Sequence, residues 1–169
     1  MISKKMEKAI NEQINRELFS EYLYLSMQAW FAGENLDGMA SWMAAQSQEE
    51  RFHAMKFFDY LMDRGGTVKL MALEQPEVDF KTPLNAFTEA YKHEQFITQS
   101  IHDLLDLAIK EKDHPTQSFL QWFVDEQVEE EATADKIVQR LKMAGNSMSI
   151  IFMMDRELGE REFDPEDEE

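Results

Sequence analysis

Four long segments of this chain have the apolar periodicity of amphipathic helices, yet each places polar side chains where the core should be. In the first segment, apolar residues recur every three or four positions, and Glu17 lies on the same stripe. The other three segments interrupt their stripes in the same way. The polar residues at core positions are Glu17 in the first segment, Glu50 and His53 in the second, Glu94 in the third, and Gln127 and Glu130 in the fourth. Any fold of this chain must accommodate a buried acidic layer.

Glycine and proline residues mark where the helical segments end. The predicted helices span about 4–32, 37–63, 84–108 and 115–141, followed by a short apolar fifth helix over 147–158. A chain of 169 residues is long enough for one domain with a full core. We expect residues 1–159 to form that domain. Residues 160–169 are mostly acidic, which predicts a disordered tail that favours solubility.

The lengths of the connections predict the topology. Only a few residues join the first helix to the second and the third to the fourth, so each pair should form an antiparallel hairpin. The link over 64–82 could reach roughly 60 Å when extended, whereas helices of this size are about 40 Å long. It can therefore cross the whole bundle, which makes the second and third helices parallel. The sequence predicts an all-α four-helix bundle with one long crossover and a short fifth helix.

The same arithmetic places the acidic core residues at one level. Glu17 precedes the first turn by about as many residues as separate Glu50 and His53 from it, at about 1.5 Å per residue. Glu94 and Glu130 are balanced similarly about the second turn. Burying unpaired carboxylates costs several kcal/mol each, and clustering them adds repulsion.

Two divalent cations would neutralise four glutamates. Oxygen ligands with one imidazole favour iron or manganese, with zinc as a competitor. The residues alone leave open a structural bundle whose core acids are protonated.

Composition excludes several other classes of function. Asp and Glu outnumber Lys and Arg by 34 to 17, and the net charge of −17 repels nucleic acid and anionic membranes while favouring cations as partners. The absence of cysteine excludes disulfides, thiolate-bound metals and cysteine nucleophiles. The chain has neither a signal-peptide apolar region nor a membrane-spanning apolar run, so we expect a cytoplasmic protein.

At its polar core residues the chain resembles the non-haem ferritins of bacteria and archaea, and the resemblance covers nearly all of it. Five stretches carry it: NRE over 15–17, YLYLSM over 22–27, QEERFHA over 48–54, KHE over 92–94 and FVDEQVEEE over 123–131. The resemblance implies a ferritin-like bundle with ferroxidase activity, in which two ferrous ions per subunit are oxidised by dioxygen or peroxide. It also implies that ferric oxyhydroxide is stored inside a hollow shell of 24 subunits.

The resemblance further implies roles for individual residues. The first iron would be held by Glu17, Glu50 and His53, with Glu50 as the bridge, and the second by Glu94, Glu130 and Gln127. For Gln127, a hydrogen bond to a ligand is the alternative role. A third iron site would use Glu49, Glu126 and Glu129, for which a solvated acidic face is the alternative. Tyr24 would lie beside the centre, or else be an ordinary core residue.

Departures from related di-iron proteins narrow this interpretation. The general pattern has two Glu-x-x-His motifs, whereas here the second motif ends in Glu130 without a histidine. The second iron should therefore be held more loosely, which suits storage. Haem is not expected, because Phe52 stands where bacterioferritins have a haem-binding methionine. The main rival is a di-iron oxidase or peroxidase on the same bundle without storage.

Two expectations concern regions outside the polar layer. The fifth helix is apolar on too much of its surface to be exposed, so it should be buried between subunits. The three histidines other than His53 are expected at the surface; they are His93, His102 and His114.

Overall fold

The computed structural model describes residues 1–168, and its regular structure is helical throughout that range. The helices are α1 (Lys4–Gly33), α2 (Asp37–Asp63), α3 (Pro83–Glu111), α4 (His114–Ala144) and α5 (Met148–Leu158), followed by a short 3₁₀ helix, η1 (Pro165–Glu168). The predicted all-α fold and its five helices are confirmed, and the boundaries differ from the predicted ones by a few residues. None of the helices in this range has an apolar stretch long enough to span a bilayer.

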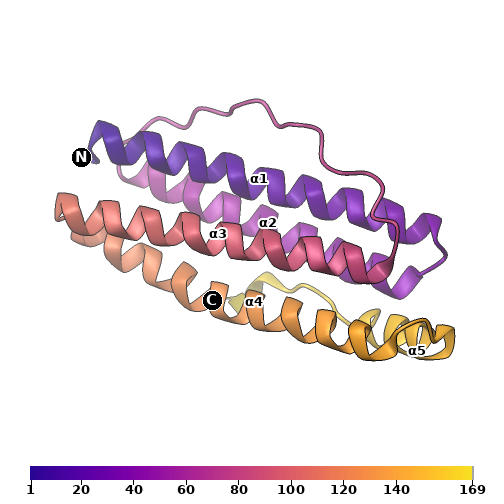
Figure 1. The fold of residues 1–169 in the computed structure, drawn as a ribbon. Coiled ribbons are helices and arrows are strands. Elements are labelled where there is room, and N and C mark those ends of the chain that lie inside the picture. Colours follow the sequence, from indigo (N-terminus) through magenta and orange to yellow (C-terminus); the bar gives the residue numbers. More distant parts are fainter. Residues whose placement is uncertain (169) are drawn as a thin grey trace.

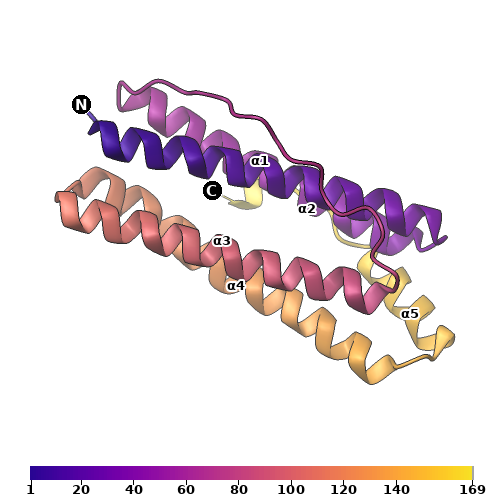
Figure 2. The same ribbon diagram turned by 45° about the horizontal axis from the view of Figure 1, so that its top comes forward.

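The first four helices pack as two antiparallel hairpins, α1 with α2 and α3 with α4 (Figure 1). Between them, the segment over 64–82 returns along the outside of α1, so that α2 and α3 run in the same direction (Figure 2). Side chains of α1 fix this crossover. Asn11 donates to the carbonyl of Thr67 (2.9 Å) and accepts from the amide of Lys69 (2.6 Å), and Ser26 donates to the carbonyl of Glu77 (2.6 Å).

Three helices begin at side-chain caps that their sequence supplies. Ser3 accepts a hydrogen bond from the amide of Met6 at the start of α1 (3.0 Å), and Thr82 accepts from Asn85 at the start of α3 (3.1 Å). Asp113 caps α4 in the same way. Such caps satisfy amides that have no partner inside the helix. The caps at Thr82 and Asp113 fix where the second hairpin begins and turns.

The apolar core is divided in two, and the polar layer lies between its parts. On α1 the buried apolar residues of one cluster end at Ile14 and those of the other begin at Leu23, with Glu17 between them. The other three helices are divided in the same way. The other predicted polar core residues lie at this level as well; they are Glu50 and His53 on α2, Glu94 on α3, and Gln127 and Glu130 on α4. Periodicity thus brings all four helices to one polar layer near mid-height.

The short helix α5 docks on the first turn of α2. Asp155 accepts a hydrogen bond from the amide of Met39 (2.8 Å), a cap that α2 does not obtain from its own Leu36. The backbones approach closely here, because a Cβ atom on Gly38 would lie 1.8 Å from the carbonyl oxygen of Asp155. Glycine at this position is therefore required for α5 to pack where it does.

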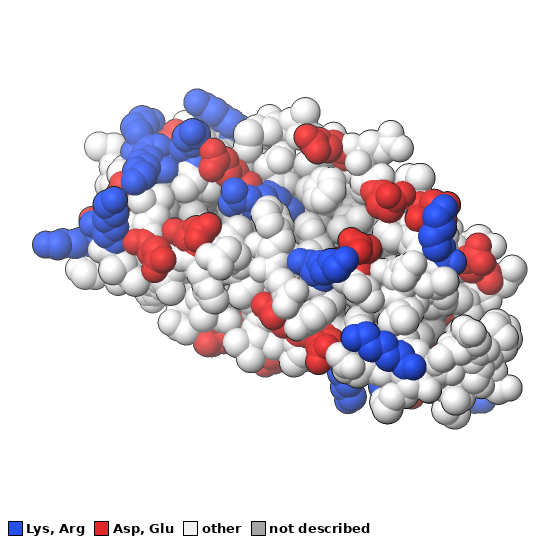
Figure 3. Space-filling model, in the orientation of Figure 1, with Lys and Arg blue, Asp and Glu red and all other residues white. Residues whose placement is uncertain are grey.

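The outward face of α5 is apolar. It exposes Met148, Ile150, Phe152 and Met153. In Figure 3 the lower right end of the molecule, where α5 lies, is mainly uncharged, with Lys or Arg side chains beside it. A contiguous apolar surface of this kind is typical of a subunit contact.

A polar cluster joins the end of α2 to the start of α4. Arg64 donates to Asp113 (3.0 Å) and to Thr116 (3.0 Å), and the Thr116 hydroxyl donates to Asp113 (2.8 Å). Burial acts to raise the pKa of Asp113, but hydrogen bonds from Thr116 and the Arg64 guanidinium outweigh it and lower that pKa.

We expect Asp113→Ala to destabilise the metal-free protein by about 2 kcal/mol, because it removes both a helix cap and a partner of Arg64. Asp113→Asn retains a capping oxygen and should lose less. Thermal melting of the three proteins measures the order, and equal loss in the two variants would contradict the capping role.

Candidate metal centre

The structure brings the predicted glutamates and His53 into two adjoining clusters. One contains Glu17, Glu50 and His53, and the other contains Glu50, Glu94 and Glu130. In each cluster one candidate ligand atom per residue lies within 4.8 Å of the others. Glu50 belongs to both, as expected for a bridging residue. All five residues are buried.

Several atoms in these clusters lack a hydrogen-bond partner. They are Glu17 Oε2, Glu50 Oε2 and His53 Nε2. His53 Nδ1 lies 3.6 Å from Glu50 Oε2, which is too far for a hydrogen bond. Unpartnered buried polar atoms cost free energy, so their grouping indicates a site for cations or protons.

Two glutamine side chains hold the first cluster in place. Gln13 Nε2 donates to Glu17 Oε1 (2.7 Å), and Gln46 Nε2 donates to both Glu50 Oε1 (3.3 Å) and Glu130 Oε2 (2.8 Å). These two roles were not predicted from the sequence, although the spacing of the residues indicates them. Each glutamine lies four residues before its glutamate, the spacing of neighbours on one helix face.

Tyr24 and Gln127 both hold Glu94. The Tyr24 hydroxyl donates to Glu94 Oε1, and Gln127 Nε2 donates to Glu94 Oε2 (3.2 Å) and to Thr98 (3.2 Å). The alternative role considered for Gln127, a hydrogen bond to a ligand, is therefore the one seen here. A ligand role would use its Oε1 atom and stays a prediction. Tyr24 lies beside the centre as expected.

Burial dominates the electrostatics of the layer. It raises the pKa of Glu94 to about 8, with the neighbouring Glu50 adding to the effect. Burial also raises the pKa of Glu50 and of Glu130 well above the ordinary glutamate value, and nearby carboxylates add to both shifts. For Glu17 the pKa is raised by burial and opposed chiefly by His53. Without a cation Glu94 therefore favours its protonated form at neutral pH, and the other three carboxylates are shifted in the same direction. A divalent ion would replace such protons.

Aromatic rings close the centre on the side of His53. The rings of Trp122 and Phe123 meet the His53 ring edge to face, with centroids 5.5 Å and 6.0 Å away. Such packing restricts the imidazole orientation and limits the access of water. Trp122 and Phe123 therefore help to hold the His53 ring in place.

The residues predicted for a third site are only partly brought together. Glu49 and Glu126 form a cluster with His53 in which candidate ligand atoms lie within 4.8 Å of one another. Glu129 is exposed on α4 and belongs to none of the clusters found among the described residues. A part for Glu129 in metal binding stays a prediction.

The segment after α5 differs from the disordered tail expected from its acidity. The guanidinium of Arg161 donates to Glu49 Oε2 and to Gln46 Oε1 (2.7 Å), and the ring of Phe163 packs 5.9 Å from that of Phe52. The physical reason is that this tail contains a cation and an aromatic ring among its acids, and α2 offers a partner for each. The domain boundary predicted at residue 159 therefore does not mark the end of the packed region.

His93 also differs from its expected place at the surface. It is half-buried, its Nε2 lies 2.7 Å from the Ser20 hydroxyl, and it contacts the ring of Phe19. Burial lowers its pKa to about 4, so it is neutral at pH 7. His102 and His114 are exposed as predicted.

Comparison with known proteins extends these observations to a family. Residues 7–144 match the Ferritin-like domain. The bacterial non-heme ferritin of Bacteroides fragilis is 46% identical over 161 residues, which cover 95% of this chain and 100% of the relative. The corresponding protein of Staphylococcus aureus is 37% identical over 166 residues, covering 98% and 100%.

Solved structures give the same result. An Archaeoglobus fulgidus ferritin engineered into a closed form by site-directed mutagenesis has a TM-score of 0.96 and 48% identity, covering 97% of this chain and 100% of that one. The open-pore ferritin of the same hyperthermophilic archaeon has a TM-score of 0.95 and 48% identity, covering 95% and 98%. The similarity includes all four helices that carry the polar layer.

Proposed function

Because this chain belongs to the ferritin family and is similar over nearly its whole length to bacterial non-haem ferritins, we propose that it oxidises Fe(II) and stores the ferric product. The observation that carries the proposal is the pair of buried clusters that share Glu50. Glu17, Glu50 and His53 would hold one ion, and Glu50, Glu94 and Glu130 the other. Oxygen donors with one imidazole suit ferrous iron.

Two ferrous ions together supply the two electrons that one molecule of the oxidant takes up. Each ion gives one electron, and dioxygen takes up two electrons and two protons to become hydrogen peroxide. Hydrogen peroxide as oxidant would take up two electrons and two protons to give two water molecules. Holding two ions at adjoining positions makes both electrons available at one place.

The protein's own groups have defined parts in this scheme. Glu50 sets the separation of the two ions, and Gln13 and Gln46 orient the carboxylates that receive them. Tyr24 holds Glu94 through a hydrogen bond from its hydroxyl group. The glutamates whose pKa values are raised by burial would release their protons as cations enter. Loss of such orienting hydrogen bonds typically costs 10–100-fold in metal affinity.

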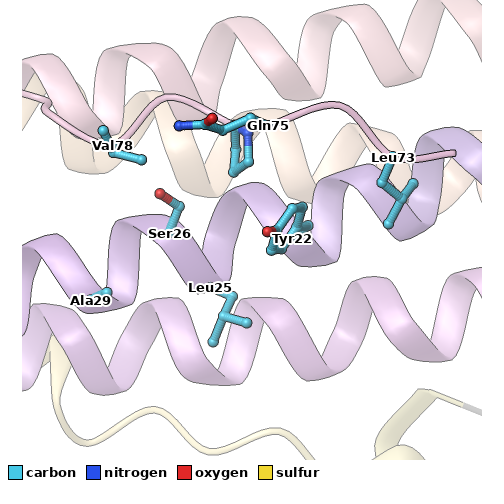
Figure 4. Close-up of a pocket in the computed structure, with 8 residues that line it drawn as sticks. Tyr22, Leu25, Ser26, Ala29, Leu73, Gln75 and Val78 are labelled. Atoms are coloured by element: carbon cyan, nitrogen blue, oxygen red, sulfur yellow. The ribbon is translucent and has the colours of Figure 1, made fainter.

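Storage requires a closed assembly, and two apolar surfaces support one. The first lies where α1 meets the crossover, at a shallow pocket lined by Tyr22, Leu25, Leu73 and Val78, among others (Figure 4). The second is the outward face of α5. Two separate surfaces on one subunit allow contacts with more than one neighbour, which a shell needs. We propose the 24-subunit shell that the resemblance implies.

Anaerobic titration with Fe(II) followed by exposure to air tests the proposal. We expect a first break at about two irons per chain and then continued loading of one very large particle. Iron per chain, oxygen consumed and particle mass are measured together.

The rivals predict different results. Saturation at about two irons on a small oligomer would identify a di-iron oxidase or peroxidase instead. Absence of binding would leave a structural bundle with protonated acids.

A further inference from the structure

The segment that follows α5 turns back along the bundle and reaches the middle of α2 (Figure 1). There the guanidinium of Arg161 meets three side chains of one α2 face. It donates to Gln46 Oε1 (2.7 Å) and to Glu49 Oε2, and its central carbon lies 4.7 Å from the centroid of the Trp42 ring. A carboxylate, an amide oxygen and an aromatic face together form a complete site for a guanidinium.

Glu49, the acidic part of this site, is also a member of the third cluster with His53 and Glu126. The carboxylate of Glu49 is buried, and His53 Nε2 is buried without a hydrogen-bond partner. His53 Nδ1 lies 3.6 Å from Glu50 Oε2, so Nε2 is the ring nitrogen left for a further cation beside Glu49 and Glu126. Arg161 pairs with the same Glu49 carboxylate that would be a ligand of such a cation.

The segment is held in a way that permits release. Between Glu160 and Glu166, Arg161 and Phe163 are partly buried, and the residues that alternate with them are exposed. The Phe163 ring packs on Phe52, whose ring contacts that of Trp122 beside His53 (centroids 6.3 Å apart). Two side chains thus attach the segment, and both do so next to the third cluster.

We propose that Arg161 is the resident counter-ion of the third site, and that a metal ion entering at Glu49, His53 and Glu126 displaces it and releases residues 160–166 from α2. This inference rests on the proposed function and adds a competition to it. Because an ion pair must be broken first, the third position should fill after the two-ion centre. The segment would then report, by its release, that the third position is occupied.

Zinc titration tests the proposal without redox chemistry, because zinc binds the same oxygen and nitrogen donors and is not oxidised. Calorimetry of the assembled protein measures the affinity of each site, and hydrogen exchange of the peptide containing residues 160–166 measures release. In the wild type we expect protection of this peptide to be lost with the third equivalent of Zn(II) and not with the first two.

Three variants sharpen the test. Arg161→Gln should expose the peptide without metal and raise the affinity of the third site about tenfold, the effect of losing a competing ion pair. Arg156→Gln makes the same change in net charge at an exposed residue of α5 and should behave as wild type. Glu49→Gln should abolish both the third binding event and the response of the peptide.

Unchanged third-site affinity in Arg161→Gln would overturn the proposal, and so would a peptide that stays protected after the third ion binds. Absence of a third binding event in the wild type and in Arg161→Gln would overturn it as well. These outcomes are distinct from failure of the storage function. A protein that releases the segment on Zn(II) binding but accumulates no mineral would retain this inference while losing the proposed function.

Discussion

Replacing Glu50 with alanine should lower the initial rate of Fe(II) oxidation by more than about 100-fold, because Glu50 joins the cluster of Glu17 and His53 to the cluster of Glu94 and Glu130. On the proposed assignment, loss of this carboxylate would remove a ligand from each ion and the group that would set their separation. Slow growth of mineral on existing nuclei does not need the pair and should continue. Stopped-flow absorbance after mixing Fe(II) with aerobic protein measures the initial rate.

Two further variants show whether the loss is specific. Asp59→Ala removes an exposed carboxylate from the same helix and should retain the wild-type rate. Glu50→Gln should lose activity as well, yet its metal-free form should melt at a higher temperature than wild type at a pH high enough to ionise Glu50, since the amide cannot acquire a buried charge beside Glu17 and Glu49. A Glu50→Ala protein that oxidises iron at the wild-type rate would refute the assigned centre.

Metal-free protein should become less stable as the pH rises from about 6.5 to about 8, the reverse of an ordinary carboxylate effect. Glu94 has a folded-state pKa of about 8 against an ordinary value of 4.5, so the folded protein binds more protons than the unfolded chain between these values. The stability that this proton confers is fully present below pH 4.5 and is lost as the pH rises through about 8. For Glu94 alone the change is on the order of 5 kcal/mol over the whole interval from pH 4.5 to about 8, of which about 2 kcal/mol falls above pH 6.5.

His93 determines the lowest pH at which the effect of Glu94 on stability can be measured without an opposing effect. Burial lowers its pKa from 6.5 to about 4, so its contribution to stability increases as the pH rises through that interval and opposes the effect of Glu94. Above pH 6.5 the decline due to the glutamates should therefore be clearest.

Thermal melting of the metal-free protein between pH 6.5 and pH 8.5 measures this decline. Glu94→Gln should flatten it, and bound Zn(II) should do the same by replacing the protons. Stability that rises across this range would contradict the protonated layer.

The positions of the helices and of the metal centre follow from local rules. Periodicity defined the helices, and the length of the crossover defined their directions. Glu17, Glu50 and Glu94 were predicted as site residues because carboxylates lie on the apolar stripes of several helices at once; any one of them alone would more simply be a solvated acid. The counting of residues from each turn then placed them at one level, which the structure confirms.

The features that the sequence did not predict depend on contacts between residues far apart in the chain, none of which has a strong pattern of its own. Gln13 and Gln46 are uncharged, so the cost of burying a charge does not identify them. Arg161 lies in a segment whose overall acidity predicts solvation, and only the folded α2 face shows what one cation there can bind. The different environments of Glu126 and Glu129 arise from the rotation of α4, which periodicity gives only approximately.

The division of the acidic layer between two hairpins has a consequence for the kinetics of folding. The α1–α2 hairpin carries Glu50, and the α3–α4 hairpin carries Glu94 and Glu130, whose repulsion with Glu50 begins only when the hairpins meet. That repulsion therefore opposes the late step in which the two hairpins dock, and it does not oppose the formation of either hairpin. A divalent cation present at that moment would speed docking, so newly made subunits would mature fastest when iron is abundant.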